Sequence, residues 1–348
     1  MGKILTRLGD GSFIELTEGE LMRDLEEGTE DAADRGKIPP LATEELKHLF
    51  DIFSCPFRFV SVEPGKEIIL SGEGNNVKVK RVGVDEDRLQ GTKIFERILG
   101  ADMADIGFPD YSVKSLKNIL HFERTLVEEA LMVTQFPISY GFMPNLGLYT
   151  QPDGPCPNPA DLMPLGKIKE AQAAYEETVE KGVEDIVHVS SAMWESGVDA
   201  ITFDTTGGAG DADFLAALEA TEILKKKYPD IKIIMGMAGE FILGLHGELE
   251  WHGTRLAGLY PHQQVKLAEE AGVTIFGPVC NVNSNKSAPW DIARAITFMK
   301  ACCEEARIPV HVDMGMGVGG VTLHDHPPID IVSRASKAMV EICRLDGL

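Results

Sequence analysis

The strongest constraint on the fold is a rhythm that begins near Ile138 and continues to the last residues. Short apolar runs rich in β-branched residues each end in Gly, Pro, Asn or Asp, and a helical pattern follows. The runs are ISYGFMPN, DAITFDTTGG, IKIIMGMAGE, VTIFGPVCN and PVHVDMGMG. Apolar residues at i, i+3, i+4 and i+7 spacing predict helices over 212–228, 290–306 and 329–344. Repeated strand–helix units of this length predict a parallel sheet.

The strand runs are apolar at almost every position, which is typical of parallel strands buried on both faces. Two architectures fit such units, a (β/α)8 barrel and an open doubly wound sheet. We favour the barrel, because polar residues recur just after each run and a barrel gathers its strand ends around one mouth. A sixth strand is expected around KNILHF (117–122). The predicted class is therefore an α/β, TIM-type barrel that is incomplete and lacks its last strands.

The first ninety or so residues differ from the rest. They contain acidic turns, a Pro-Pro step at 39–40 and short alternating stretches such as FRFVSVE and NVKVKRVGV. These features predict a helix followed by small antiparallel strands. The expected organisation is an N-terminal α+β extension over 1–92 and a barrel domain over 93–348.

Composition and charge exclude several classes of partner and site. The 348 residues carry a formal net charge of −22, whereas nucleic-acid binding needs clustered Lys and Arg. No apolar run is long enough to cross a membrane and no secretory signal is recognisable, so a cytoplasmic protein is expected. The six cysteines lack CxxC spacing and are expected to be thiols. Because His246, His252, His262, His324 and His326 form no compact ligand set, no metal site is predicted.

Chemically useful side chains follow the strand runs. The carboxylates are Asp204, Glu240 and Asp313, and the polar side chains that accompany them are Tyr140, Asn281 and Asn283. Each carboxylate taken alone is equally consistent with a helix cap or a structural hydrogen bond. Three of them at the ends of barrel strands favour acid–base chemistry on a nitrogen or carbonyl centre.

Two glycine-rich stretches resemble nucleotide loops without completing one. In GMGVGG (315–320) no helix begins on the third glycine, and no acidic ribose partner stands at the right distance. DTTGGAGDAD (204–213) has backbone N–H groups for a phosphate, but no Lys or Arg accompanies it. Neither stretch predicts a dinucleotide-binding enzyme.

Several long stretches resemble one known family. GLYTQPDGPCPNPADLM, FDTTGGAGDAD, MAGEFILGLHG, LAGLYPHQQ, FGPVCNVNSNKSAPWDIARAITFMKA and SRASKAMVEI are similar to the dimethylamine methyltransferases of methylamine-using methanogens and some bacteria. The similarity runs nearly end to end. It implies a (β/α)8 barrel that moves one methyl group from dimethylamine to the Co(I) corrinoid of a partner protein, leaving monomethylamine, in methylamine-dependent methanogenesis. It also implies that no cofactor is bound directly, and it favours a homo-oligomer.

The resemblance also bears on the final stretch, RLDGL. In this family a pyrrolysine, encoded by an in-frame amber codon, follows a helix that ends in Asp-Gly and an apolar residue. The resemblance therefore implies that Asp346-Gly347-Leu348 turns into a further strand and that a catalytic pyrrolysine follows Leu348. On this view the chain is the part of the enzyme that precedes pyrrolysine, and activity of residues 1–348 alone is not implied.

The roles of the carboxylates are hypotheses from their position at strand ends. A carboxyl group in a barrel mouth from which water is excluded can protonate the ring nitrogen of an imine, because burial raises the pKa of the carboxyl group. We expect Glu240 to be that acid, with Asp204 and Asp313 balancing the charge that develops on the amine. The three polar residues that accompany them would orient the amine. Two other classes stay open: a short non-catalytic homologue that binds an amine or the corrinoid protein, and an unrelated barrel lyase.

Overall fold

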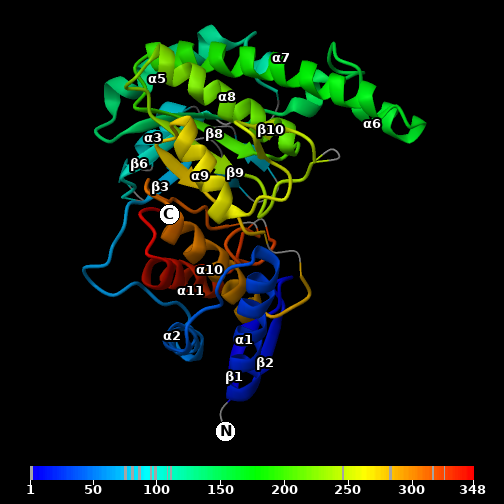
Figure 1. Cartoon of the computed structure of the whole chain (residues 1–348). Coiled ribbons are helices and arrows are strands. Elements are labelled where there is room, and N and C mark those ends of the chain that lie inside the picture. The colour runs from blue at the N-terminus through cyan, green and yellow to red at the C-terminus, as the bar shows by residue number, and fades with distance from the viewer. Residues whose placement is uncertain are drawn as a thin grey trace. The chain divides into compact units, whose positions relative to one another are not determined.

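The structure is a computed structural model in which the chain forms two compact units. One unit comprises residues 69–259 and 267–276, and the other comprises residues 1–68, 260–266 and 277–348. Figure 1 labels many of the helices and strands of both. The described residues are 3–73, 77–79, 82–84, 88–94, 96–97, 100–107, 109, 112–244, 247–281, 284–315, 317–324 and 326–348.

The first of these units is built on a parallel sheet of six strands. They are β3 (Ser71–Glu73), β6 (Met103–Gly107), β7 (Ile138–Phe142), β8 (Ala200–Thr206), β9 (Ile233–Met237) and β12 (Ile275–Gly277). Their order across the sheet is β12-β9-β8-β7-β6-β3, so each strand lies beside the one that precedes it in the chain. The sheet is curled into part of a barrel, which confirms the predicted class of an incomplete (β/α) barrel.

Helices cover this sheet. They include α3 (Arg88–Ile94), α4 (Val113–Leu116), α5 (Leu120–Val133), α6 (Pro159–Leu162), α7 (Ile168–Glu195) and α8 (Asp211–Lys227). Figure 1 shows α7 packed alongside both α5 and α8. Helix α8 confirms the helix predicted over 212–228. Within the part of the chain that the structure describes, none of the helices combines the length and apolar character needed to span a bilayer.

The two faces of the sheet differ in chemistry. Every residue of β7 is buried, as expected for a parallel strand with neighbours on both faces. One face is aromatic, with Tyr140, Phe142 and Phe203 fully or almost fully buried. The other face carries hydroxyl groups, and the Thr202 and Ser139 hydroxyls lie 3.1 Å apart. Ser139 and Thr202 therefore share one face, because side chains alternate between the faces with a period of two, and burial on both faces is as expected.

The unit that contains both ends of the chain has a helical core. Its elements are β1 (Ile4–Arg7), β2 (Phe13–Leu16), α1 (Glu18–Gly36), α2 (Thr43–Ser54), α10 (Ala288–Glu305), α11 (Ile329–Ala338) and a π-helical turn over Met339–Cys343. Strands β1 and β2 form an antiparallel hairpin, and α1 packs along α10. A Cβ atom at Gly28 of α1 would collide with the carbonyl of Trp290, so glycine is required for this close approach. The helices predicted over 290–306 and 329–344 are confirmed.

Two short segments of the same unit pair in parallel near the end of the chain. His311 and Gly347 form a parallel bridge. The Val312 N–H donates to the Gly347 carbonyl at 3.2 Å, and the Asp346 N–H donates to the Val310 carbonyl at 3.1 Å. The run PVHVDMGMG therefore makes a short bridge and not a regular strand. Residues 346–347 take part in this extended pairing.

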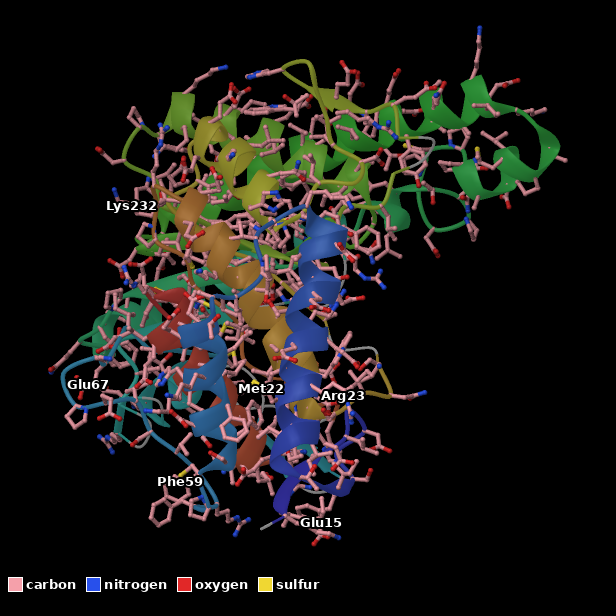
Figure 2. The ribbon with its side chains drawn as sticks, turned by 60° about the horizontal axis from the view of Figure 1, so that its bottom comes forward. Glu15, Met22, Arg23, Phe59, Glu67 and Lys232 are labelled. Atoms are coloured by element: carbon pink, nitrogen blue, oxygen red, sulfur yellow. The ribbon has the colours of Figure 1, made fainter. Side chains whose placement is uncertain are left out.

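Other expectations for the strands need correction. KNILHF is not a strand, because it forms the turn after α4 and the first residues of α5. FRFVSVE is not a strand either. Side chains bind its backbone carbonyls: the Arg334 guanidinium donates to the Phe57 carbonyl at 2.8 Å and the Lys337 ammonium donates to the Ser61 carbonyl at 2.9 Å. Phe59 of this segment points outward (Figure 2) and is 63% exposed.

The predicted hairpin in NVKVKRVGV is present in the described residues, as β4 (Val77–Val79) paired antiparallel with β5 (Val82–Val84). The strands that precede β7 in the main sheet are β3 and β6, which no sequence pattern indicated. The sequence of β6 is MADIG, in which Ala, Asp and Gly have low strand propensity. Its place in the sheet comes from its neighbours and not from its own residues.

Candidate active site

A polar cluster lies on the hydroxyl-bearing face of the sheet. The Thr202 hydroxyl of β8 lies 3.1 Å from the Ser139 hydroxyl of β7 and 3.5 Å from Asp105 Oδ1 of β6. Three neighbouring strands thus direct polar side chains to one point. Asp105 was not among the residues predicted from the sequence. The signal for it was a carboxylate placed between apolar residues in a short run.

Asp204 lies two residues after Thr202, on the same face of β8. Its Oδ1 accepts a hydrogen bond of 2.7 Å from the N–H of Thr205. A Cβ atom at Gly236 of β9 would lie 3.0 Å from that oxygen, so glycine leaves room for the carboxylate. Thr205 has a φ of +52°, in the left-handed region that β-branched residues rarely adopt. The backbone is therefore strained directly after the first predicted carboxylate.

Glu240 lies in the bend after β9 and is partly exposed. The loop that carries it packs against the loop after β8. The Ala238 N–H donates to the Thr206 carbonyl at 2.9 Å, and a Cβ atom at Gly207 would lie 3.0 Å from the Ile242 side chain. The structure thus brings together the loops of two predicted carboxylates, Asp204 and Glu240.

Tyr140 lies on the aromatic face. Its hydroxyl donates a hydrogen bond of 2.6 Å to Glu123 Oε2 on α5, and both side chains are buried. Its ring centroid is 6.5 Å from that of Phe142 in the same apolar layer. The hydroxyl of Tyr140 therefore lies toward the helices, on the face opposite to Thr202.

The remaining predicted residues belong to the other compact unit or are not described. Asn281 forms an antiparallel backbone bridge with Val318, and Asn283 lies outside the described residues. Asp313 follows the bridged segment 310–312.

Asp313 has a histidine neighbour that sequence reasoning missed. Surrounding protein atoms raise the pKa of the Asp313 carboxyl by desolvation, although its side chain keeps solvent contact, and protonated His311 opposes that rise. Desolvation lowers the pKa of His311, while Asp313 and a hydrogen bond with the Leu348 backbone oppose the fall. The ring of His311 packs directly on Gly347, where a Cβ atom would collide with it. The missed signal was the i, i+2 spacing that puts His311 and Asp313 on one side of an extended segment.

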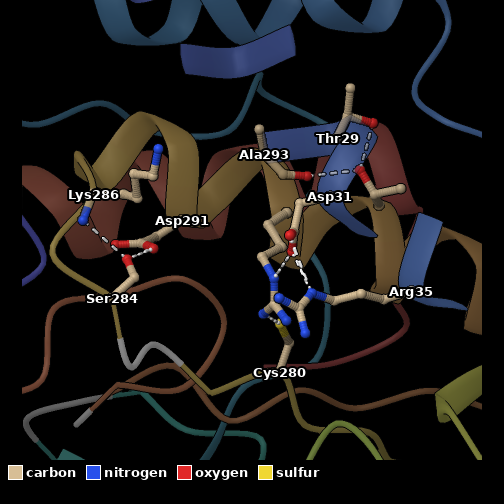
Figure 3. Close-up of polar contacts among 10 residues, drawn as sticks. Thr29, Asp31, Arg35, Cys280, Ser284, Lys286, Asp291 and Ala293 are labelled. Carbon is tan, nitrogen blue, oxygen red and sulfur yellow. Dashed lines mark hydrogen bonds and ion pairs between the residues drawn. The ribbon is translucent and has the colours of Figure 1, made fainter. Parts of the chain in front are cut away.

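A second polar network joins α1 and α10 (Figure 3). Arg294 donates to Asp31 Oδ2 at 2.7 Å and to the Cys280 sulfur at 3.4 Å. Ser284 donates a short hydrogen bond to Asp291, and burial raises the pKa of Asp291 to about 7. These contacts hold Cys280 and Ser284 to α10, which is a structural role.

A cavity of about 530 Å³ lies among α2, α10 and the π-helical turn. Its wall is crossed by an ion pair between Lys300 and Glu45 at 2.9 Å and by a hydrogen bond between His48 and Glu341 at 2.7 Å. None of the predicted site residues lines it. Over the described ranges, no group of three or more His, Cys, Asp or Glu side chains has the geometry to hold a metal ion.

The structure therefore describes two separate groups of candidate residues, each confined to one compact unit. The polar face of the sheet brings together Asp105, Thr202 and Asp204, with Glu240 on the adjoining loop. The bridged segment near the end of the chain carries Asp313 and His311. A protein-family model described as dimethylamine methyltransferase (Dimeth_PyL) matches residues 3–348, which span both groups.

Proposed function

The chain belongs to the dimethylamine methyltransferase family, and from this premise we propose that it transfers a methyl group from dimethylamine to the Co(I) corrinoid of a partner protein. Monomethylamine is the other product. The match over residues 3–348 carries the proposal. The corrinoid arrives with the partner protein as the methyl acceptor, so the chain itself needs no bound cobalt.

The reaction sets a clear chemical demand on the site. A neutral secondary amine is a very poor methyl donor, because its leaving group would be a strongly basic amide anion. Methyl transfer becomes feasible when the nitrogen carries positive charge. Carboxylates near the amine stabilise that charge, most strongly where water is excluded. Asp204 on the polar face of the sheet and Glu240 on the adjoining loop supply this chemistry.

We assign separate roles to the carboxylates. Glu240 donates a proton to the site as a general acid, and Asp204 balances the charge on the amine. The N–H group of Thr205 and the space left by Gly236 fix the position of the Asp204 carboxylate. Asp105, held near Thr202, adds negative charge to the same face.

The family resemblance adds a catalytic pyrrolysine to this proposal. Its ring imine would supply an electrophilic carbon that holds the amine. His311 packs on Gly347 and hydrogen-bonds with the Leu348 backbone, which holds the segment that carries Asp313. Asp313 is proposed, with Asp204, to balance the charge that develops on the amine. Asn281 and Asn283 are proposed to orient the amine.

The proposal is tested by direct methyl-transfer assay of the full-length protein. The enzyme is produced in a host that inserts pyrrolysine at amber codons and is mixed with the cognate corrinoid protein reduced to Co(I). Conversion to methyl-Co(III) is followed by its visible spectrum, with dimethylamine, monomethylamine or trimethylamine as donor. We expect conversion with dimethylamine and at least tenfold slower conversion with the other two amines.

The same assay separates the alternatives. Binding of the corrinoid protein or of dimethylamine without methyl transfer would indicate the non-catalytic homologue. Release of ammonia or an alkene from another amine would indicate a lyase.

Light scattering of the same preparation tests whether the protein is a homo-oligomer, which the family resemblance favours. Fractionation of the native cells tests the cytoplasmic location, which the composition favours.

A further inference from the structure

The pairing of β8 with β9 is irregular beside Asp204. The register of the two strands shifts between Phe203 and Thr206. In that interval two residues of β8, Asp204 and Thr205, oppose one residue of β9, Gly236. A bulge of this kind changes the direction of side chains on the longer strand and is common beside active sites. The Asp204 carboxylate therefore leaves β8 at a bulge whose only counterpart on β9 is a glycine.

The backbone of β9 does not itself require glycine at this position. The φ of Gly236 lies outside the left-handed region, so a residue with a side chain could adopt the same conformation. Glycine weakens the interior of a strand and often marks a place where a ligand or another backbone approaches closely. Gly236 is also the only residue of β9 that is partly exposed, whereas the other four are buried. The need for glycine therefore comes from the space beside it.

That space is bordered by the Asp204 carboxylate. A Cβ atom at Gly236 would lie 3.0 Å from Asp204 Oδ1, and the next nearest atoms, at 3.7 and 3.8 Å, also belong to β8. Further along β9, Met237 is 3% exposed and the two residues before Glu240 are Ala238 and Gly239. We call the partly exposed backbone of Gly236 next to the Asp204 carboxylate the Gly236 shelf.

The shelf suits one particular feature of the amine. Protonated dimethylamine carries two N–H groups and two methyl groups on the same nitrogen. Its N–H groups make strong, charge-assisted hydrogen bonds with a carboxylate. Because the methyl groups are bonded directly to that nitrogen, a methyl group must lie close to the carboxylate whenever the nitrogen binds it. Monomethylamine has one methyl group fewer and needs less room beside the carboxylate.

We propose that Gly236 is a specificity-determining residue, because its shelf receives one methyl group of dimethylammonium while the nitrogen donates to Asp204. This inference rests on the proposed methyl transfer for its substrate, and it adds the reason why dimethylamine is preferred. A Cβ atom at residue 236 takes the place of that methyl group. It leaves room for an amine with one methyl group fewer.

The test compares wild type with Gly236→Ala in the full-length enzyme with its corrinoid partner. The value of kcat/KM is measured with dimethylamine and with monomethylamine. One methyl group in a fitted site changes kcat/KM by about 10–200-fold. We expect Gly236→Ala to lose at least tenfold in kcat/KM for dimethylamine and to stay within threefold of wild type for monomethylamine. An equal loss with both amines, or an unchanged preference, would overturn the proposal.

Gly239→Ala is the matched control, since it adds the same methyl group three residues further along the chain. Its Cβ atom would meet only the Phe241 carbonyl oxygen, at an ordinary contact distance of 3.5 Å. The φ of Gly239 also lies outside the left-handed region. This variant is expected to keep the wild-type preference for dimethylamine. A loss of preference as large as that in Gly236→Ala would overturn the specific role of the shelf.

A binding measurement separates the shelf from the proposed reaction. Dimethylammonium chloride and monomethylammonium chloride are titrated calorimetrically into the full-length protein without the corrinoid protein. Gly236→Ala is expected to bind dimethylammonium at least tenfold more weakly than wild type and to bind monomethylammonium within threefold, which also shows that the variant is folded. Equal affinity of both proteins for dimethylammonium would overturn the shelf even if methyl transfer occurred. A wild-type enzyme that binds with this selectivity but transfers no methyl group would refute the proposed function and leave the shelf standing.

Discussion

The two faces of the parallel sheet meet different surroundings, although the same strands build both. On the aromatic face Phe142 and Phe203 lie 5.5 Å apart between ring centroids, and both are almost completely buried. On the opposite face Thr202 and Ser139 form a hydroxyl pair, with Asp204 two residues further along β8. The two faces therefore differ in role: one face stabilises the fold and the other carries the proposed chemistry. Substitutions on the two faces should therefore have separable effects.

The largest expected effect lies on the aromatic face. Phe203→Ala removes a ring with no exposed surface and leaves a cavity beside Phe142. Large-to-small changes of this kind cost about 3–5 kcal/mol of unfolding free energy. Denaturant unfolding of the full-length protein measures the loss. Leu165→Ala, at a side chain that is 69% exposed, serves as the control and should change stability by less than about 0.5 kcal/mol. A loss of unfolding free energy below about 1 kcal/mol for Phe203→Ala would contradict the stabilising role of the aromatic face.

The next effect is on the rate of catalysis and leaves stability almost unchanged. Glu240→Gln removes the proposed general acid from a partly exposed loop. General acids contribute about 10²–10⁴ in rate, so we expect methyl transfer to slow about a hundredfold or more. The unfolding free energy should change by less than about 1 kcal/mol. Glu250→Gln, at an exposed site on β10 (Glu250–Trp251), is the matched control and should keep full activity. Methyl transfer within twofold of wild type would remove Glu240 from the mechanism.

The fold could be predicted from the sequence wherever periodicity and composition agreed. The runs that form β7, β8 and β9, and the helix α8, carry both signals. Strand β6 carries neither, because its sequence MADIG is short and poor in β-branched residues. KNILHF misled for the opposite reason, since a short apolar run fits either a strand or the start of a helix.

The site could be predicted in part, because strand ends can be located without knowing strand pairing. That was enough for Asp204 and Glu240, whose loops do make contact. It was not enough for Asp105, which reaches Thr202 only through the register of three strands. Nor could it show that Tyr140 faces α5, because the face of a residue depends on where alternation starts. Register and face are properties of the assembled sheet, and local sequence does not contain them.

A smaller effect is expected from the pH dependence of stability. Burial raises the pKa of Asp213 from an ordinary 3.8 to about 7, against the opposing loop N–H groups. Between these two pH values the folded protein keeps a proton that the unfolded chain has released. Stability should therefore fall as pH rises from about 4 to about 7, by at most about 1.4 kcal/mol per pH unit from this group. Asp213→Asn removes this contribution, so its unfolding free energy should become less pH-dependent than that of wild type. If the unfolding free energies of the two proteins changed with pH in the same way, the raised pKa of Asp213 would be contradicted.

The smallest effect concerns the hydroxyl of Tyr140, on the aromatic face. Tyr140→Phe keeps the buried ring and removes only the hydroxyl that donates to Glu123 at 2.6 Å. Loss of one buried hydrogen bond costs about 1–3 kcal/mol, because the partner is left unsatisfied. Since this hydroxyl lies toward α5, the structure leads us to expect lower unfolding free energy with an unchanged KM for dimethylamine. A rise in KM at unchanged stability would instead support the amine-orienting role predicted from the sequence, and would mean that the two faces are not separate in function.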